Sequence, residues 1–299
     1  MGGRERKLTV DIIHILIHYL SDHETLLALA LACDIATTPV AQHIWRCPKP
    51  KSIQHVEKLT QVVQQSLSSN AKKQGSRLLP FYRLWITGYD FSTLGPDSAL
   101  HVPASSFTTL LTITTLRLEY LNLNHCIALS SDLVSRHMPS LRYLNLSSCT
   151  QFSSATLISI LTQDLDSSLR TLDLSNCSIN DAVIIRVARH HNRLRDLYLK
   201  HSGNISDSAI MALAESCPEL EHIIIGLPHG IVQSNKITDT SMTTLAQSCP
   251  RLKTVICRGQ TRITEKSKEM FDQKCPNIAI CDLSAEEMSS HHQHIQTHN

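Results

Sequence analysis

The sequence predicts an α/β solenoid, with parallel strands lining a concave face and helices covering a convex face, preceded by a small all-α module. Two recurring patterns support the solenoid: a leucine-rich strand pattern, and a helix-start pattern that falls between its copies. One strand–loop–helix repeat cannot bury its own apolar face, so successive repeats must stack and share a core. The N-terminal residues follow neither pattern, which indicates a separate module.

The strand pattern is L-x-x-L-x-L, in which the leucines face the core and the intervening residues face the concave side. Its copies begin at Leu118, Leu141, Leu169, Leu194, Leu220 and Leu252, with a weaker copy at Ile278. Phe81, Leu84 and Ile86 are predicted to form an earlier, degenerate copy. A spacing of roughly 25 residues gives about seven to eight repeats over residues 80–283.

The helix-start pattern is an apolar residue, a capping residue and an aspartate. Its polar pairs are Asn180-Asp181, Ser206-Asp207 and Thr238-Asp239. Ser, Thr and Asn cap helix N-termini, and an aspartate in the first turn suits the helix dipole. Each predicted helix contains an alanine where neighbouring helices must pack closely, at Ala188, Ala214 and Ala246. Cys-Pro pairs beginning at Cys217, Cys249 and Cys275 then end the helices.

Together these patterns resemble the cysteine-containing class of leucine-rich repeats over roughly residues 80 to 283. Three further cysteines, Cys126, Cys149 and Cys177, each follow a strand by three residues and are predicted to stack as buried, small apolar side chains. No C-x-x-C pair is present, so we expect neither a metal site nor a cofactor.

Residues 1–47 are predicted to form a separate helical module. The segments Leu8–Leu20 and Leu26–Cys33 are apolar almost all round, so a partner or the repeats must cover them. Residues 48–79 are predicted to be a helical linker, with Val56, Leu59 and Val63 at helical spacing. The tail 284–299 has no apolar period and is predicted to be disordered.

The order and spacing of the apolar residues from Leu8 to Trp45 resemble an F-box. Thr9 and Ala36 stand where that motif usually has proline and tryptophan. An F-box followed by cysteine-containing repeats is similar to the F-box/leucine-rich-repeat substrate receptors, especially the fungal ones. The resemblance implies adaptor contacts by the apolar residues Leu8, Ile12, Ile15, Leu16, Leu20, Leu26, Leu27 and Trp45.

The resemblance also implies a function. Such a chain is a non-catalytic subunit of an SCF-type (cullin–RING) ubiquitin ligase, which binds the SCF adaptor and, through it, cullin–RING. Its repeats hold a protein substrate, here unknown, for ubiquitination and degradation. The alternative is a repeat scaffold or inhibitor that acts by occupying a signalling or cell-cycle protein, with the N-terminal module serving as a cap.

Strand alternation places the candidate substrate-binding residues on the concave face. They are Tyr143, Asn145, Asp173, Asp196, Tyr198, Lys200, His222, Ile224, Ile256 and Arg258. One strand-to-helix loop, over residues 226–236, is longer than the others and adds His229 and Ile231. Inserted loops on repeat proteins often carry binding, so we expect this loop to contribute.

Composition argues against several other functions. A formal net charge of +2 and 4% aromatic residues do not favour nucleic acid as a partner. No apolar run reaches membrane-spanning length, so no membrane association is expected. No nucleotide-binding or hydrolase motif is present, and His190-His191 fall at a predicted helix end. Ten cysteines without a credible signal segment favour a cytoplasmic or nuclear location, or both.

Overall fold

The computed structural model describes residues 34–67, 82–99, 101–114, 117–127, 140–163, 168–201, 205–226 and 234–283. Contacts divide the chain into two compact units, an N-terminal unit Met1–Leu141 and a C-terminal unit Arg142–Asn299. This division falls inside the predicted solenoid, because the first strands belong to the N-terminal unit. No described helix is long and apolar enough to span a bilayer.

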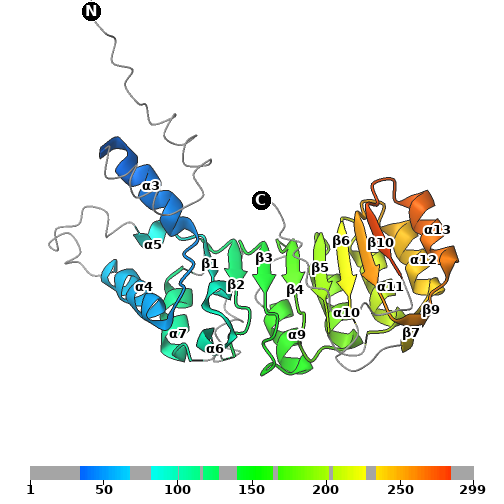
Figure 1. Cartoon of the computed structure of the whole chain (residues 1–299), viewed down its shortest axis with the longest axis horizontal. Helices are drawn as coiled ribbons and strands as arrows, with labels where there is room; N and C mark the ends of the chain where they lie inside the picture. The colour runs from blue at the N-terminus through cyan, green and yellow to red at the C-terminus, as the bar shows by residue number, and fades with distance from the viewer. Residues whose placement is uncertain are drawn as a thin grey trace, which may run out of the picture. The chain divides into compact units, whose positions relative to one another are not determined.

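The N-terminal unit combines helices with two short parallel strands (Figure 1). Its helices are α3 (Asp34–Arg46), α4 (Ile53–Gln65), α5 (Tyr82–Trp85), the 3-10 turn η3 (Ser92–Leu94), α6 (Pro96–Ala99) and α7 (Ala104–Thr114). Its strands are β1 (Gly88–Asp90) and β2 (Tyr120–Asn122). The predicted linker helix is α4, whose apolar face packs against α7 and buries Val56, Leu59 and Val63. The N-cap Ser52 Oγ accepts a hydrogen bond from the His55 amide at 3.3 Å.

The earliest repeat lies in a different frame from the predicted one. Residues 82–85 are helical, and strand β1 follows them, so the prediction of Phe81, Leu84 and Ile86 as a strand copy is wrong. Gly88 pairs with Tyr120, and this register aligns Ile86, Tyr89 and Phe91 with the leucines of the next copy. All three are fully buried. Two aromatic side chains therefore occupy positions that leucines hold in the other repeats. A search for leucines does not detect this repeat at its true position.

The C-terminal unit is a stack of strand–loop–helix repeats (Figure 1). Its main strands are β3 (Tyr143–Asn145), β4 (Thr171–Asp173), β5 (Asp196–Leu199), β6 (His222–Ile225), β8 (Thr254–Cys257) and β10 (Ile280–Asp282). They pair in that order, all in parallel. The helices are α9 (Ser154–Gln163), α10 (Asp181–His190), α11 (Asp207–Ser216), α12 (Asp239–Ser248) and α13 (Glu265–Lys274), and each packs on the next. A second, two-stranded sheet pairs β7 (Ser234–Thr238) with β9 (Gln260–Arg262).

The predicted core is confirmed in these repeats. The pattern leucines and their equivalents from Leu144 to Val255 are buried, as are the alanines of helices α10 to α12. Turns after the strands repeat one backbone conformation, with positive φ at His125, Ser148, Asn176 and His201. The cysteines that follow the first three of these turns are buried, and Cys177 Sγ donates to the Leu146 carbonyl at 3.1 Å.

The aspartates at the starts of helices α10, α11 and α12 link successive repeats. The Asp181 carboxylate accepts from the Ser206 amide at 2.8 Å and from its hydroxyl at 2.5 Å. Asp207 accepts from the Thr238 amide and hydroxyl, both at 2.8 Å, and from the Ser241 hydroxyl. Asp239 holds Thr264 in the same way. The carboxylate of one helix thus anchors the N-cap residue of the next, a role beyond the predicted dipole interaction.

Helix ends carry a matching link between repeats. Cys217, Cys249 and Cys275 are the C-cap residues, as the Cys-Pro pairs predict. Their thiols point to carbonyls of the preceding repeat, such as Cys249 Sγ to the Cys217 oxygen at 3.3 Å. Helix α10 has His191 at this position instead, and its Nε2 lies 2.7 Å from the Leu161 carbonyl. Its side chain is fully buried, and Nδ1 has no partner among the described residues.

Removing one linking carboxylate should destabilise the C-terminal unit. We expect Asp207→Ala to lower the free energy of unfolding by about 2 to 3 kcal/mol, because three donors lose a charged acceptor. The matched control is Glu215→Ala, an exposed position on the same helix, which should cost less than about 0.5 kcal/mol. Urea unfolding followed by circular dichroism measures both. Equal midpoints for the two variants would show that the link does not stabilise the stack.

His191 should make stability depend on pH. Burial lowers the pKa of His191 below its ordinary 6.5, so the folded chain keeps the ring neutral while the unfolded chain takes up a proton first. Stability is therefore fully present above pH 6.5 and falls as the pH drops below that value. We expect His191→Cys to remove about 1 kcal/mol of the stability difference between pH 7.5 and pH 5.5. Denaturant unfolding at both pH values tests this; an unchanged difference would contradict it.

Candidate functional site

The candidate site is the sheet face of the C-terminal unit that lies opposite its helices, called the strand face below. The strands lie side by side in one sheet (Figure 1). Their pairing puts the side chains of this face in two rows across the sheet. The first row consists of Tyr143, Thr171, Asp196, His222, Thr254 and Ile280, and the second of Asn145, Asp173, Tyr198, Ile224, Ile256 and Asp282. The register therefore brings together eight of the twelve predicted substrate-binding residues on one surface.

The beginning of the strand face is polar and internally bonded. Asn145 Oδ1 accepts from the Ser147 amide at 2.7 Å, and Asp173 Oδ1 accepts from the Ser175 amide at 2.8 Å. Asn145 is buried, and burial raises the pKa of Asp173 against the lowering effect of its Ser175 hydrogen bonds. Both side chains therefore shape the turn that follows their strand, whatever else they contact.

Strand β5 marks the change from polar to apolar. Asp196 Oδ2 accepts from the Thr171 hydroxyl at 2.6 Å. Tyr198 is half-buried, and burial, followed by the charge of Asp196, raises its pKa to about 12, so the phenol is neutral. A neutral tyrosine offers an apolar ring with a hydroxyl donor at its tip.

The centre of the strand face is apolar. Tyr198, Ile224 and Ile256 are paired neighbours on adjacent strands, and all three are half-buried. His222, also half-buried, lies beside Asp196 in the first row. Three partly exposed apolar side chains in consecutive register form a continuous strip across three strands.

The two predicted cations differ in their surroundings. Lys200 is exposed, and its amide donates to the Ser175 hydroxyl at 3.1 Å. Arg258 is paired with Asp282 of β10: its Nε donates to Oδ2 at 2.6 Å, and Nη2 contacts the same oxygen. Between them stands Gly226, where a Cβ would lie 3.1 Å from the His201 nitrogen. The backbone of the neighbouring repeat comes too close to leave room for a side chain at position 226, between Lys200 and Arg258.

The long loop is described only at its end. His229 and Ile231 lie outside the described residues. The loop enters β7, which pairs with β9, and the Ile237 amide donates to buried Gln260 at 3.2 Å. This second sheet anchors the loop's C-terminal end to the following repeat.

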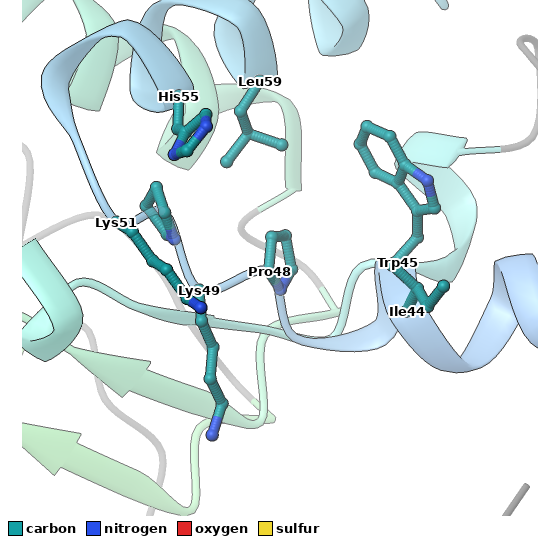
Figure 2. Close-up of a pocket in the computed structure, with 8 residues that line it drawn as sticks. Ile44, Trp45, Pro48, Lys49, Lys51, His55 and Leu59 are labelled. Carbon is teal, nitrogen blue, oxygen red and sulfur yellow. The ribbon is translucent and has the colours of Figure 1, made fainter. Parts of the chain in front are cut away.

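Of the predicted adaptor-binding residues, only Trp45 lies among the described ones; Leu8 to Leu27 fall outside them. Trp45 lies in the last turn of α3 and lines a cavity of about 380 Å³ in the N-terminal unit. Figure 2 shows its ring, Pro48 and Leu59 around one space, while Lys49 points away. Lys49 Nζ lies 3.5 Å from the Asp90 carboxylate, which orients it toward the first strand.

Sequence reasoning missed the buried histidine and the links between repeats. The signal for His191 was available, since it occupies the repeat position that holds a cysteine in three other helices. Within the described parts of the chain, no group of three His, Cys, Asp or Glu side chains is arranged to hold a metal ion.

Comparison with known proteins supports the repeat fold. A family model described as leucine-rich repeat matches residues 166–182, which cover β4 and the turn after it. A chain from the crystal structure of the Rad7 and Elc1 complex in yeast superposes with a TM-score of 0.51 at 18% identity. The fold is a leucine-rich-repeat solenoid.

The match covers 67% of this chain and 50% of the chain from the yeast complex, so this chain spans about half of that relative's length. Two lower-scoring structures are leiomodin-1 actin-binding site 2 and an internalin from Listeria monocytogenes. The first has a TM-score of 0.38 at 12% identity, covering 49% of this chain and 86% of its own; the second has 0.32 at 13%, covering 81% and 93%. No curated protein sequence matches.

The pairing of Arg258 with Asp282 should stabilise the last repeat. We expect a double-mutant cycle of Arg258→Ala and Asp282→Ala to give a coupling of about 1 kcal/mol, because both side chains are partly buried and share two hydrogen bonds. Urea unfolding of the four proteins measures it. A coupling near zero would show that the pair does not stabilise the last repeat.

Proposed function

We propose that this chain is a protein-binding receptor whose strand face holds its protein partner. The observation that carries the proposal is the strip of Tyr198, Ile224 and Ile256, three partly exposed apolar side chains in consecutive register. Large apolar and aromatic side chains at the centre of a polar surface are typical anchors of protein interfaces.

The surroundings of the strip suit a protein partner. Asp196, His222 and Lys200 flank it with charged or titratable groups, which provide a polar rim. A rim of this kind selects a partner by charge, while the apolar centre supplies affinity. The loop 226–236, with His229 and Ile231, is proposed to extend the interface.

We further propose that the chain is the substrate-recognition subunit of an SCF-type ubiquitin ligase. Support comes from the F-box-like order of residues 8–46 and from the fold likeness to a chain crystallised in a complex of two proteins, Rad7 and Elc1. The apolar N-terminal segment would bind the SCF adaptor and thereby cullin–RING.

In this role the chain needs no catalytic residue of its own. Holding a substrate lysine near a charged ubiquitin-conjugating enzyme raises its effective concentration, and proximity alone accelerates transfer. A cytoplasmic or nuclear location follows from the same proposal. The alternative is a scaffold or inhibitor that binds its partner on the same face and acts by occupancy; it would use the N-terminal segment as a cap.

Two variants separate the adaptor-binding and partner-binding roles. Ile12→Asp/Leu16→Asp should abolish co-purification with the SCF adaptor, because it places charges on the apolar segment that the adaptor covers. Tyr198→Ala/Ile256→Ala should leave adaptor binding unchanged and act as the matched control. In cells, a true substrate should have a longer half-life with either variant than with the wild-type chain.

Circular dichroism confirms that each variant is folded before its binding is interpreted. If the folded wild-type chain never retains the adaptor, the ligase proposal is wrong and the occupancy alternative stands. If the folded Tyr198→Ala/Ile256→Ala variant still binds the protein partner, the strand face is not the binding site.

A further inference from the structure

A second surface lies where the strands of the C-terminal unit begin. The residue just before each strand forms a row joined by backbone hydrogen bonds. The Arg170 amide donates to the Arg142 carbonyl at 2.7 Å, Arg195 to Arg170 at 2.7 Å, Glu221 to Arg195 at 2.8 Å and Lys253 to Glu221 at 2.7 Å. Neighbouring strands are about 4.8 Å apart, so this row places four cations and one carboxylate side by side.

A parallel row lies two residues earlier in the chain and holds Arg193, Glu219 and Arg251. The Glu219 carboxylate is shared among three guanidinium groups: Arg195 at 3.3 Å, Arg251 at 3.9 Å and Arg170 at 4.0 Å. Glu221 contacts Lys253 and, at 3.7 Å, Arg195. The two carboxylates therefore stand against six cations, and positive charge is in excess along the edge.

The cationic side chains of these two rows, called the cationic edge, are open to solvent. The side chains of Arg170 and Arg195 are 30% and 44% exposed, and those of Arg251 and Lys253 are 61% and 48% exposed. Each guanidinium has five donors, and one shared carboxylate cannot satisfy three of them. The guanidinium groups of the cationic edge therefore have donors left to bind further anionic groups.

We propose that the cationic edge binds an acidic segment of a protein partner. Arg142, Arg170 and Arg195 lie just before three adjacent strands. At about 4.8 Å between strands, the first and last of them are about 10 Å apart, the length of about three residues of extended chain. Carboxylates on such a segment match the planar, two-pronged geometry of guanidinium. The segment would cross the strand ends and displace Glu219 from its weaker contacts with Arg170 and Arg251.

A protein segment fits better than nucleic acid. Glu219 and Glu221 sit within the edge and would repel a continuous phosphate backbone, whereas a peptide can place neutral residues opposite them. The edge and its two rows contain no aromatic side chain on which a base could stack. The inference concerns the strand ends, not the strand face, and does not depend on adaptor binding.

The test uses the full chain and a fluorescently labelled octapeptide of alternating glutamate and serine, measured by anisotropy. We expect wild-type binding that weakens several-fold when salt rises from about 50 to about 300 mM. Arg170→Gln/Arg195→Gln should weaken binding at least tenfold. The charge-matched control Arg186→Gln/Arg189→Gln, at exposed positions of α10, should stay within twofold of wild type.

Glu219→Gln gives a second, opposite expectation. Removing this internal carboxylate frees the guanidinium groups, so the peptide should bind at least threefold more tightly, an effect that misfolding would not produce. Equal affinities for the two double-arginine variants would overturn the proposal. So would tighter binding of an octathymidine strand than of the peptide with loss in the same variant, because the edge would then be a nucleic-acid site.

Discussion

The carboxylate that reaches from one helix start to the next capping residue is the interaction on which the C-terminal unit depends. A single repeat has an apolar side that it cannot bury, so its fold exists only when its neighbour is in register. Asp181, Asp207 and Asp239 supply that register, since each binds both the amide and the hydroxyl of the following N-cap. Fixing the helix starts fixes the spacing of the repeats, and the strands then pair without a shift. The strand face and the cationic edge both follow from this alignment.

At the other end of each helix, the same C-cap position holds either a cysteine or a histidine. Three C-cap cysteines and His191 share nearly the same dihedral angles and point at carbonyls of the preceding repeat. A thiol is a weak donor and costs little to bury, whereas an imidazole makes a shorter bond but leaves a second nitrogen to satisfy. The stack therefore accepts a titratable group at its interior where packing alone would favour a cysteine.

The sequence was sufficient for what is local and periodic. Short sequence patterns predict the strands from Leu141 onward, the helix caps and the Cys-Pro helix ends. The structure confirms all of these, including the caps at Asn180, Ser206 and Thr238. The first repeat was predicted at the wrong residues because Tyr89 and Phe91 replace leucines, and a leucine pattern does not detect them. Contacts between repeats were not predicted for a different reason. Whether Asp207 meets Thr238, or Arg258 meets Asp282, depends on the stacking offset, which no single repeat encodes.

Two surfaces of opposite character arise from one repeat. Positions within the strands give an apolar strip of Tyr198, Ile224 and Ile256, while positions just before the strands give the cationic edge. Neither set contributes to the leucine core or to the aspartate links between helix starts. A repeat protein of this kind can combine affinity from the strip with charge selection from the edge. Because both surfaces belong to the same parallel sheet, the sheet fixes the distance between the apolar strip and the cationic edge. A single partner could therefore contact both only if its apolar anchor and its acidic segment have that spacing.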